Sequence, residues 1–276
     1  MLLNKEIRTI CYDEELGVEA YRLEGIAKPF PNHFHDYYVI GCIETGARAL
    51  ICRGREYTVG RGSVLLFNPY DSHGCVSLDG EALDYRGLNI PKEKMRILSR
   101  EITGSGDLPF FSENVIEDDE IRGCIGSLHQ LIMDGSDSSE RYDKLRLLGS
   151  LLTKKYGQRD ADSVPEHSEE VLRTCEFMRE HLDEHITLEQ LCGCSGLSKS
   201  GLLRAFAKVK GITPYRYLQT IRIDRAKKLL EQGASPVEAA LRTGFSDQSH
   251  FTNFFRMFIG LSPAAYRRIF KEKDNG

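Results

Sequence analysis

The spacing of apolar residues divides the chain into a front part with the pattern of short strands and a back part with the pattern of helices. Between residues 18 and 90, β-branched, aromatic and other apolar residues form short runs separated by turn-forming Gly, Pro, Asn and Asp. The predicted strands span residues 37–43, 47–52, 56–59, 64–67 and 82–89. Short strands at this close spacing predict a small barrel or sandwich.

Two amphipathic helices follow the predicted strands, at residues 117–134 and 139–156, around a polar loop at 135–138. The first carries an apolar stripe at helical spacing, which predicts that it packs onto its own domain. Its members are Ile121, Cys124, Ile125, Leu128, Leu131 and Ile132. The next segment, residues 157–168, is polar and has no period, so we interpret it as a linker.

An internal repeat occupies the last third of the chain. One copy runs from Gly196 to Tyr217 and the other from Gly244 to Tyr266. Each has a Gly-x-Ser step, an apolar pair at helical spacing, and a closing Gly-x-Thr/Ser-Pro-x-x-Tyr segment. The repeat predicts two copies of one supersecondary unit.

Capping residues define the helices of each copy. Thr187, with Gln190 three residues later, predicts a capping box, and Gly196 provides the sharp turn after that helix. Ser198 is expected to cap a second helix that extends to about residue 210. Each copy therefore reads as a helix, a glycine turn and a helix.

The second copy shows the same signals. Ser235 and Pro236 predict the start of one helix, Gly244 the turn, and Ser246 or Asp247 the cap of the next helix. A joining helix is predicted from Thr213-Pro214 to about residue 232. It would fix the spacing of the two units, and adjacent major-groove faces of DNA lie about 34 Å apart.

The second helix of each copy has one apolar face and one polar face. In the later copy, four phenylalanines at positions 251, 254, 255 and 258 form the inward stripe. The outward residues are of types that read base edges, since arginine pairs with guanine and asparagine or glutamine pairs with adenine. The candidate DNA-binding residues are Ser200, Leu203, Arg204, Lys208, Gln248, Ser249, Asn253 and Arg256. On the joining helix, Arg222, Arg225, Lys227 and Lys228 are candidates for phosphate contacts.

Charge supports an interaction of the back half with a polyanion. The chain has a net charge of −4, which divides into −8 for residues 1–168 and +4 for residues 169–276. No run of about 18 apolar residues occurs and the first residues lack the pattern of a signal peptide, so we expect a cytoplasmic protein without a membrane segment. The eight cysteines are dispersed within apolar runs, which is typical of reduced, buried thiols.

Four motifs within residues 170–270 resemble the AraC/XylS family of bacterial transcription regulators. They are GLLRAFAKVKGITP from Gly201, RIDRAKKLL from Arg222, GFSDQSHFTNFFR from Gly244 and GLSPAAYR from Gly260. The resemblance implies a seven-helix domain with two reading helices that binds double-stranded promoter DNA, with RNA polymerase as a further possible partner. Carried over by position, the base readers are Ser200, Leu203, Arg204, Gln248, Ser249 and Asn253. The second helix is chemically the richer reader, because the first depends on a single arginine.

The front half carries a string that resembles the cupin barrel used as a sensor by many of these regulators. It consists of His33-x-His35-Asp36, then a glycine at 62, a proline at 69 and His73. The candidate ligand-binding residues are His33, His35, Tyr37, Arg53 and His73. Metal-binding cupins add a glutamate three or four residues after the second histidine, where this chain has Val39 and Ile40. We therefore expect no metal and no other cofactor.

The sequence thus predicts an α+β chain of two domains. Residues 1–156 form a cupin-like β-barrel with helices that, by the resemblance, dimerise; residues 157–168 form the linker; and residues 169–272 form an all-α domain with two helix-turn-helix units. The predicted function is that of a sequence-specific DNA-binding transcription regulator, not an enzyme, whose barrel senses a small molecule. Two alternatives stay open: a metal-dependent cupin enzyme with a nucleic-acid-binding tail, and a thiol-based redox sensor.

Overall fold

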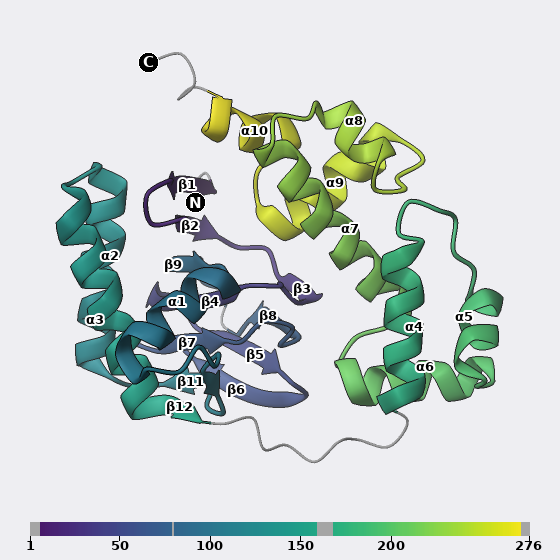
Figure 1. Ribbon diagram of the computed structural model, residues 1–276, viewed down its shortest axis with the longest axis horizontal. Coiled ribbons are helices and arrows are strands. Elements are labelled where there is room, and N and C mark those ends of the chain that lie inside the picture. The colour runs from purple at the N-terminus through teal and green to yellow at the C-terminus, as the bar shows by residue number, and fades with distance from the viewer. Residues whose placement is uncertain (1–5, 79, 159–167, 272–276) are drawn as a thin grey trace. The chain divides into compact units, whose positions relative to one another are not determined.

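The computed structural model describes residues 6–78, 80–158 and 168–271 (Figure 1). The chain divides into two compact units, Met1–Phe30 with Phe34–Ala161, and Pro31–His33 with Asp162–Gly276. The first contains all of the strands except most of β3, together with three helices, and the second is helical apart from Pro31–His33, so the α+β prediction with two domains is confirmed. No helix within the described ranges is both long enough and apolar enough to cross a membrane.

Two sheets form the first unit. The six-stranded sheet has the order β1-β2-β9-β4-β7-β11, and the four-stranded sheet has the order β3-β8-β5-β6. The strands are β1 (Ile7–Asp13), β2 (Val18–Ile26), β3 (Phe30–His33), β4 (Tyr38–Thr45), β5 (Arg48–Cys52), β6 (Arg55–Val59), β7 (Val64–Phe67), β8 (His73–Ser77), β9 (Leu83–Ile90) and β11 (Val115–Ile116). A further short pair joins β10 (Phe110–Phe111) to β12 (Gly157–Gln158).

Alternation along the central strands creates two cores. On β4, Val39 and Ile43 belong to a cluster shared with the four-stranded sheet, whereas Ile40 and Cys42 belong to a second cluster on the opposite face. Because successive side chains of a strand point to opposite faces, a strand buried on both sides must be apolar throughout. This explains why the prediction of strands from unbroken apolar runs succeeds here.

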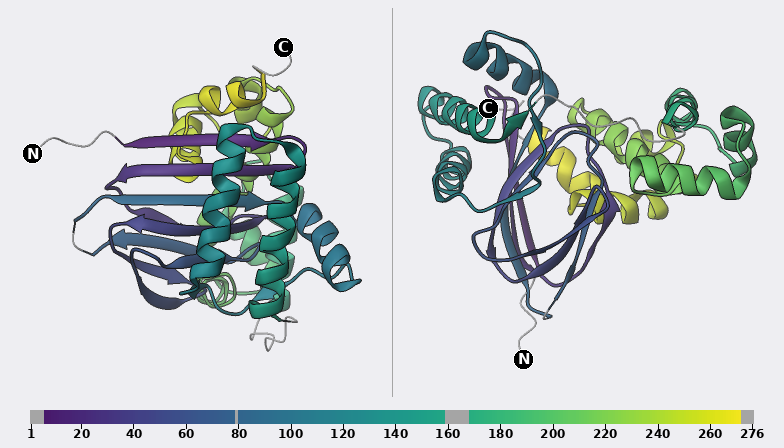
Figure 2. Two further views of the ribbon diagram at one scale, coloured as in Figure 1. Left: turned by 90° about the vertical axis from the view of Figure 1, so that its left-hand side faces the viewer. Right: turned by 90° about the horizontal axis from the view of Figure 1, so that it is seen from below.

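Three helices contribute side chains to the second cluster. They are α1 (Lys92–Thr103), α2 (Asp119–Asp134) and α3 (Ser138–Tyr156). Helix α2 packs on the six-stranded sheet and on α3, and α1 packs on α3. Figure 2 shows α2 and α3 running across the strands in its left view. Asp118 caps α2 by accepting a hydrogen bond from the Ile121 amide, and Asp137 caps α3. Both predicted helices are therefore present, within two residues of the expected bounds.

The second unit consists of seven helices among its described residues. They are α4 (Ser168–Glu180), α5 (Leu188–Ser195), α6 (Lys199–Lys210), α7 (Pro214–Glu231), α8 (Pro236–Leu241), α9 (Gln248–Ile259) and α10 (Pro263–Lys271). The pairs α5–α6 and α8–α9 are the two predicted helix-turn-helix units, and α7 joins them. Since α7 contacts α4 and α6 as well as α8, α9 and α10, it is the shared core element of this unit.

Several strands and one helix of the first unit have no counterpart among the predicted elements: β1, β2, β3, β8, β10, β11, β12 and α1. The polar segment 157–168 also differs from the expected linker at its start, because Gly157 and Gln158 pair with β10. Residues 159–167 of that segment lie outside the described residues.

Candidate DNA-binding faces and ligand site

The two candidate reading helices, α6 and α9, begin in the same way. The Ser198 side chain accepts a hydrogen bond from the Gly201 amide, and the Asp247 side chain accepts one from the His250 amide. Each helix follows a left-handed glycine, Gly196 with a φ of 73° and Gly244 with a φ of 71°. Non-glycine residues rarely adopt this conformation, so these glycines fix where the first helix of each unit stops and the second begins.

Burial separates the two faces of each helix as the pattern predicts. Leu202 and Phe206 of α6 are fully buried, and so are Phe251 and Phe255 of α9. All eight candidate DNA-binding side chains are exposed: Ser200, Leu203, Arg204 and Lys208 on α6, and Gln248, Ser249, Asn253 and Arg256 on α9. Each helix therefore anchors one face in the domain and leaves a face with hydrogen-bonding groups in solvent.

Of the four basic residues predicted to contact phosphates from α7, two are exposed and two are buried. Arg225 and Lys228 are exposed, but Arg222 and Lys227 are each 7% exposed. Arg222 donates from Nε to the Leu182 carbonyl at 2.8 Å and from Nη2 to the Glu184 carbonyl at 2.6 Å. It is thus bound to the turn that follows α4 and is not a phosphate contact.

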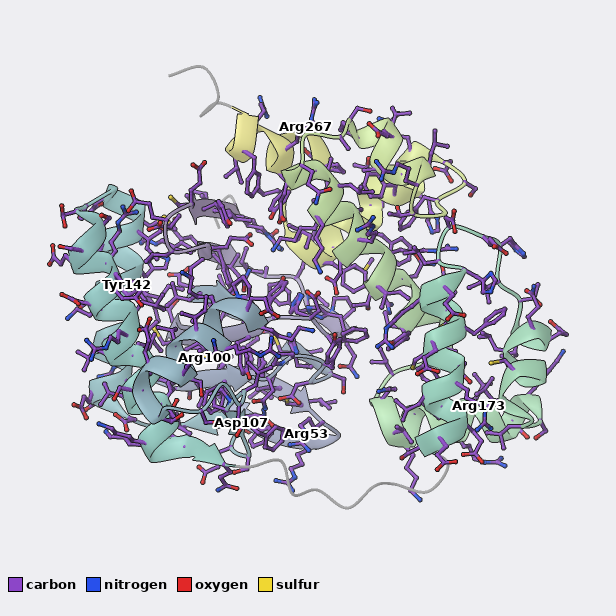
Figure 3. The ribbon with its side chains drawn as sticks, viewed as in Figure 1. Arg53, Arg100, Asp107, Tyr142, Arg173 and Arg267 are labelled. Atoms are coloured by element: carbon purple, nitrogen blue, oxygen red, sulfur yellow. The ribbon has the colours of Figure 1, made fainter. Side chains whose placement is uncertain are left out.

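Two further arginines hold backbone carbonyls within this unit (Figure 3). Arg173 on α4 donates to the carbonyl of Ser195 at the end of α5, at 3.3 Å. Arg267 on α10 donates two hydrogen bonds to the carbonyl of Gly233. Carbonyls at helix ends lack partners within their own helix, so these arginines stabilise the segments around the turns.

Four of the five predicted ligand-site residues, His35, Tyr37, Arg53 and His73, lie in the first unit, whereas His33 is grouped with the second. The rings of His35 and Tyr37 stack with centroids 4.7 Å apart, and those of His35 and His73 lie 5.4 Å apart. The ring of His73 also stacks on Phe67 at 4.0 Å. His33 closes β3, and β3 is the neighbour of β8, the strand that begins with His73.

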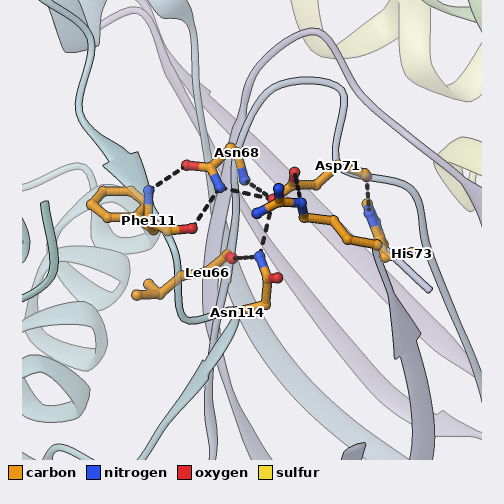
Figure 4. Close-up of polar contacts among 7 residues, drawn as sticks. Leu66, Asn68, Asp71, His73, Phe111 and Asn114 are labelled. Atoms are coloured by element: carbon orange, nitrogen blue, oxygen red, sulfur yellow. Dashed lines mark hydrogen bonds and ion pairs between the residues drawn. The ribbon is translucent and has the colours of Figure 1, made fainter. Parts of the chain in front are cut away.

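Arg53 joins this region through a buried carboxylate. Its Nε lies 3.6 Å from Oδ1 of Asp71, and its guanidinium lies over the ring of Phe110 at 4.9 Å from the centroid. The Asp71 carbonyl oxygen lies 2.9 Å from Nδ1 of His73 (Figure 4). Asp71 therefore links the two residues: its carboxylate pairs with Arg53 and its backbone carbonyl accepts a hydrogen bond from His73.

The Asp71 carboxylate is held by amides. Its Oδ2 accepts hydrogen bonds from the backbone and the side chain of Asn68, at 2.9 and 2.8 Å, and from Asn114 at 3.0 Å (Figure 4). Burial raises the pKa of this carboxyl, and the hydrogen bonds from Asn68 and the nearby Arg53 oppose that effect. Asn68, Asp71 and Asn114 are not among the candidates from the sequence, because an Asn and an Asp between two strands are typical of a connecting turn and no local signal points to residue 114.

Five of the eight cysteines lack the properties of a thiol sensor. No disulfide joins any of the eight, which all lie within the described residues, and burial raises the pKa of Cys42 to about 11 and also raises that of Cys52, Cys75, Cys124 and Cys175. Reactive thiols need a lowered pKa and access to solvent. A role in thiol-based redox sensing is therefore not supported for these five cysteines.

Comparisons with known proteins give one family match for each half of the chain. The AraC-like ligand binding domain family matches residues 15–152, and a helix-turn-helix domain family matches residues 191–269. An uncharacterized HTH-type transcriptional regulator of Bacillus subtilis (strain 168), YbfI, is 49% identical over 249 residues, which is 90% of each chain. The HTH-type transcriptional activator RhaS of Klebsiella pneumoniae (strain 342) is 25% identical over 249 residues, covering 87% of this chain and 88% of RhaS.

Among solved structures, an apo form of ToxT from Vibrio cholerae strain SCE256 has the same fold. It superposes with a TM-score of 0.57 and 17% identity over 94% of this chain and 99% of that one. The family matches and the Bacillus relative extend over both units. They show that the chain belongs to the AraC family of helix-turn-helix, DNA-binding transcription regulators, with an AraC-like ligand-binding domain in its first half, a family of regulators and not of enzymes.

Proposed function

We propose that this regulator reads its operator through the exposed faces of α6 and α9. The observation that carries the proposal is the pairing of two capped helices, each after a left-handed glycine, with all eight candidate DNA-binding side chains in solvent. Arg204 on α6 and Asn253 on α9 have the side chains best suited to bidentate contacts with guanine and adenine. Gln248 and Ser249 make α9 the stronger reader.

The joining helix α7 supports this reading in two ways. Its core contacts with both halves of the unit hold α6 and α9 at one fixed separation, as reading two successive major-groove faces requires. Its exposed cations, Arg225 and Lys228, supply sequence-independent contacts to phosphates. Lys208 and Arg256 on the reading helices add further positive charge.

The first unit is the sensor in this proposal. A small-molecule effector binds where His33, His35, Tyr37 and His73 meet, with Arg53 as a further polar contact through Asp71. An effector alters DNA occupancy only as far as it binds one arrangement of the protein more tightly than another. We further propose residues 1–156 as the sensing and dimerising domain, with α2 and α3 forming the homodimer contact, residues 157–168 as the linker, and residues 169–272 as the DNA-binding domain. The bound promoter implies a cytoplasmic location and RNA polymerase as a partner.

Binding assays with single variants test the reading faces. Arg204→Ala and Asn253→Ala should each weaken specific operator binding by about 1–3 kcal/mol, or roughly 5- to 150-fold, while binding to random DNA persists. Operator fragments would first be obtained by genomic mapping of bound sites, and affinities measured at one fixed salt concentration. The matched control is Arg61→Ala, which removes an exposed arginine from the turn between β6 and β7 of the first unit, away from both the reading helices and the proposed dimer contact.

The outcomes separate base reading from general electrostatics. Equal losses for operator and random DNA in Arg204→Ala would make Arg204 a phosphate contact. Unchanged operator footprints in both variants would refute the assigned faces. Unchanged affinity in Arg61→Ala is expected in either case.

A further inference from the structure

An ion pair joins the two helices of the first helix-turn-helix unit across their glycine turn. Nζ of Lys199, the first residue of α6, is hydrogen-bonded to Oε1 of Glu189, the second residue of α5. The pair lies on the surface, since the side chains of Lys199 and Glu189 are 61% and 66% exposed. Their hydrogen bond raises the pKa of Lys199 and lowers the pKa of Glu189, so each partner stabilises the charged form of the other. The cation at the start of the candidate reading helix α6 thus already has a negatively charged partner.

Lys199 lies at the edge of the face through which α6 is proposed to read DNA. It precedes the exposed candidates Ser200 and Leu203 by one and four residues, and residues four apart on a helix are neighbours on its surface. In helix-turn-helix proteins the N-terminal residues of the second helix approach the bases, while the first helix crosses the DNA backbone. The ammonium of Lys199 and the carboxylate of Glu189 therefore lie between the reading helix and the helix that crosses the backbone, which is where phosphates pass.

The helix-turn-helix unit does not need this pair for its fold. Exposed ion pairs contribute little to stability, and the turn is already fixed by the left-handed Gly196 and the Ser198 cap. The internal repeat gives an independent comparison, because Glu189 corresponds to position 237 at the offset of 48 residues between the two glycine turns. Val237, which is 50% exposed, occupies that position, and α9 begins with the uncharged Gln248. The second unit therefore forms the same turn without this pair.

We propose that Lys199 contacts a DNA phosphate in the operator complex and that binding exchanges the carboxylate of Glu189 for that phosphate. Lysine suits such an exchange because its ammonium is a compact charge on a flexible stem and accepts no fixed geometry from its partner. Glu189 is the positioning residue: it holds the ammonium beside the reading face in the free protein, and its own charge repels DNA that does not displace it. The inference rests on the proposed reading role of α6 and adds a residue that is not among the eight candidates.

The exchange has a measurable electrostatic signature. While Lys199 is paired with Glu189, the pair has no net charge and displaces no counterion from DNA. Once the ammonium neutralises a phosphate, a further counterion is released, and the slope of log K against log salt concentration steepens by about 0.9. The double variant Lys199→Met, Glu189→Gln keeps the net charge of the protein unchanged. It therefore separates a phosphate contact by Lys199 from general attraction between the protein and DNA.

Salt-dependent binding of the full-length chain to an operator fragment from the genomic mapping tests the exchange. The slope should fall by about one in Lys199→Met and by about the same amount in the double variant. Glu189→Gln should keep the wild-type slope and bind the operator roughly two- to fivefold more tightly, because breaking the ion pair no longer opposes binding. The matched control is Glu93→Gln with Arg96→Met, which removes an exposed ion pair from α1 of the first unit without a change in net charge. Its slope should be that of the wild type.

A wild-type slope in the double variant would overturn the proposal, because the ion pair would then stay closed on DNA. Unchanged or weaker operator binding by Glu189→Gln would overturn the positioning role of the carboxylate. Urea denaturation checks that each variant folds, and Lys199→Gln replaces Lys199→Met if the methionine destabilises the chain.

Failure of the exchange is distinguishable from failure of the proposed reading face. Loss of operator preference in Arg204→Ala, together with a wild-type slope in the double variant, would keep the reading face and reject the exchange. Wild-type footprints in Arg204→Ala and Asn253→Ala, together with a reduced slope in the double variant, would reject the reading faces and keep Lys199 as a phosphate contact.

Discussion

Arg222 provides a sharp test of how the DNA-binding unit holds together, because its sequence context and its surroundings in the fold predict opposite roles. In the sequence it belongs to a basic run that suggests phosphate contacts. In the structure its guanidinium donates to the carbonyls of Leu182 and Glu184 and lies 6.0 Å from the centroid of the Phe245 ring. A Cβ added to Gly244 would lie 2.7 Å from its Nη2. Arg222 thus connects the turn after α4 with the turn between α8 and α9.

The cost of losing this side chain follows from its hydrogen bonds. Hydrogen bonds from a charged donor contribute about 1.5–3 kcal/mol each, and the lower end applies because burial of the guanidinium is itself unfavourable and lowers the pKa of Arg222. Two such bonds give about 3 kcal/mol for Arg222→Met, which keeps most of the aliphatic packing. A free-energy loss of that size corresponds to a roughly hundredfold increase in the population of open states.

Hydrogen exchange measured by mass spectrometry resolves the effect by segment in the full-length chain. Amides of α4 and α7 should exchange roughly a hundredfold faster in Arg222→Met if they open with the unit as a whole, whereas those of α2 should be unchanged and serve as an internal reference. The matched control is Arg225→Met, three residues later on the same helix, where the exposed side chain should contribute less than about 0.5 kcal/mol to stability.

Salt dependence of DNA binding separates the two roles of these arginines. Each phosphate contact contributes about 0.9 to the slope of log K against log salt concentration, so Arg225→Met should reduce the slope by about one and Arg222→Met should leave it unchanged. The opposite pattern, with normal exchange and a reduced slope in Arg222→Met, would refute the structural role derived from its two carbonyl contacts.

Three other changes test the turns, the caps and a buried histidine. Gly244→Ala should destabilise the DNA-binding unit by more than about 1–2 kcal/mol in urea denaturation, because φ is +71° and the new Cβ would also meet the Leu182 carbonyl at 2.7 Å. Ser198→Ala should cost about 1 kcal/mol by the same measurement, through loss of the α6 cap. Burial lowers the pKa of His129 below its ordinary 6.5, so below about pH 6.5 the unfolded chain binds a proton that the folded chain does not, and stability falls as pH falls. His129→Gln should flatten that loss, by at most about 1.4 kcal/mol per pH unit, in denaturation curves at pH values between about 5 and 8.

The sequence predicts best where a structure depends on neighbours along the chain. The capping box of Thr187 and Gln190 is present with both hydrogen bonds, and Asp247, one of two candidates, is the cap of α9. The glycine turns of the two repeats likewise depend on residues that are adjacent in the sequence. Helix starts and turns could be predicted because a few adjacent residues determine them.

The burial of α7 could not be predicted in the same way. A helix surrounded on most sides by other helices has no single apolar stripe, so its charged residues look like a solvated face. Arg222 is buried because distant carbonyls, 38 and 40 residues earlier in the chain, satisfy its donors. Nothing within its own turn of helix indicates those partners.

The proposed ligand site combines local and distant determinants. His33 and His35 are two residues apart, so the sequence places them together, but their distance from His73 depends on the pairing of β3 with β8. The network around Asp71 depends on contacts across 43 residues, to Asn114. The residue types could therefore be predicted from the sequence, whereas their convergence and the amides that hold the carboxylate follow only from the sheet topology.

The hydrogen bonds around Asp71 also connect the turn at residues 68–71 with a distant segment of the first unit. The Asn68 side chain accepts a hydrogen bond from the Phe111 amide at 2.8 Å and donates one to the Phe111 carbonyl at 2.9 Å. Both backbone polar groups of Phe111 are therefore hydrogen-bonded to Asn68. Phe111 pairs in turn with Gly157, directly after the end of α3. Because buried polar groups are costly to leave unpaired, the turn that positions His73 and the strand that ends the first unit's described residues cannot shift independently. Asn68 thereby fixes the position of the proposed ligand site relative to β12.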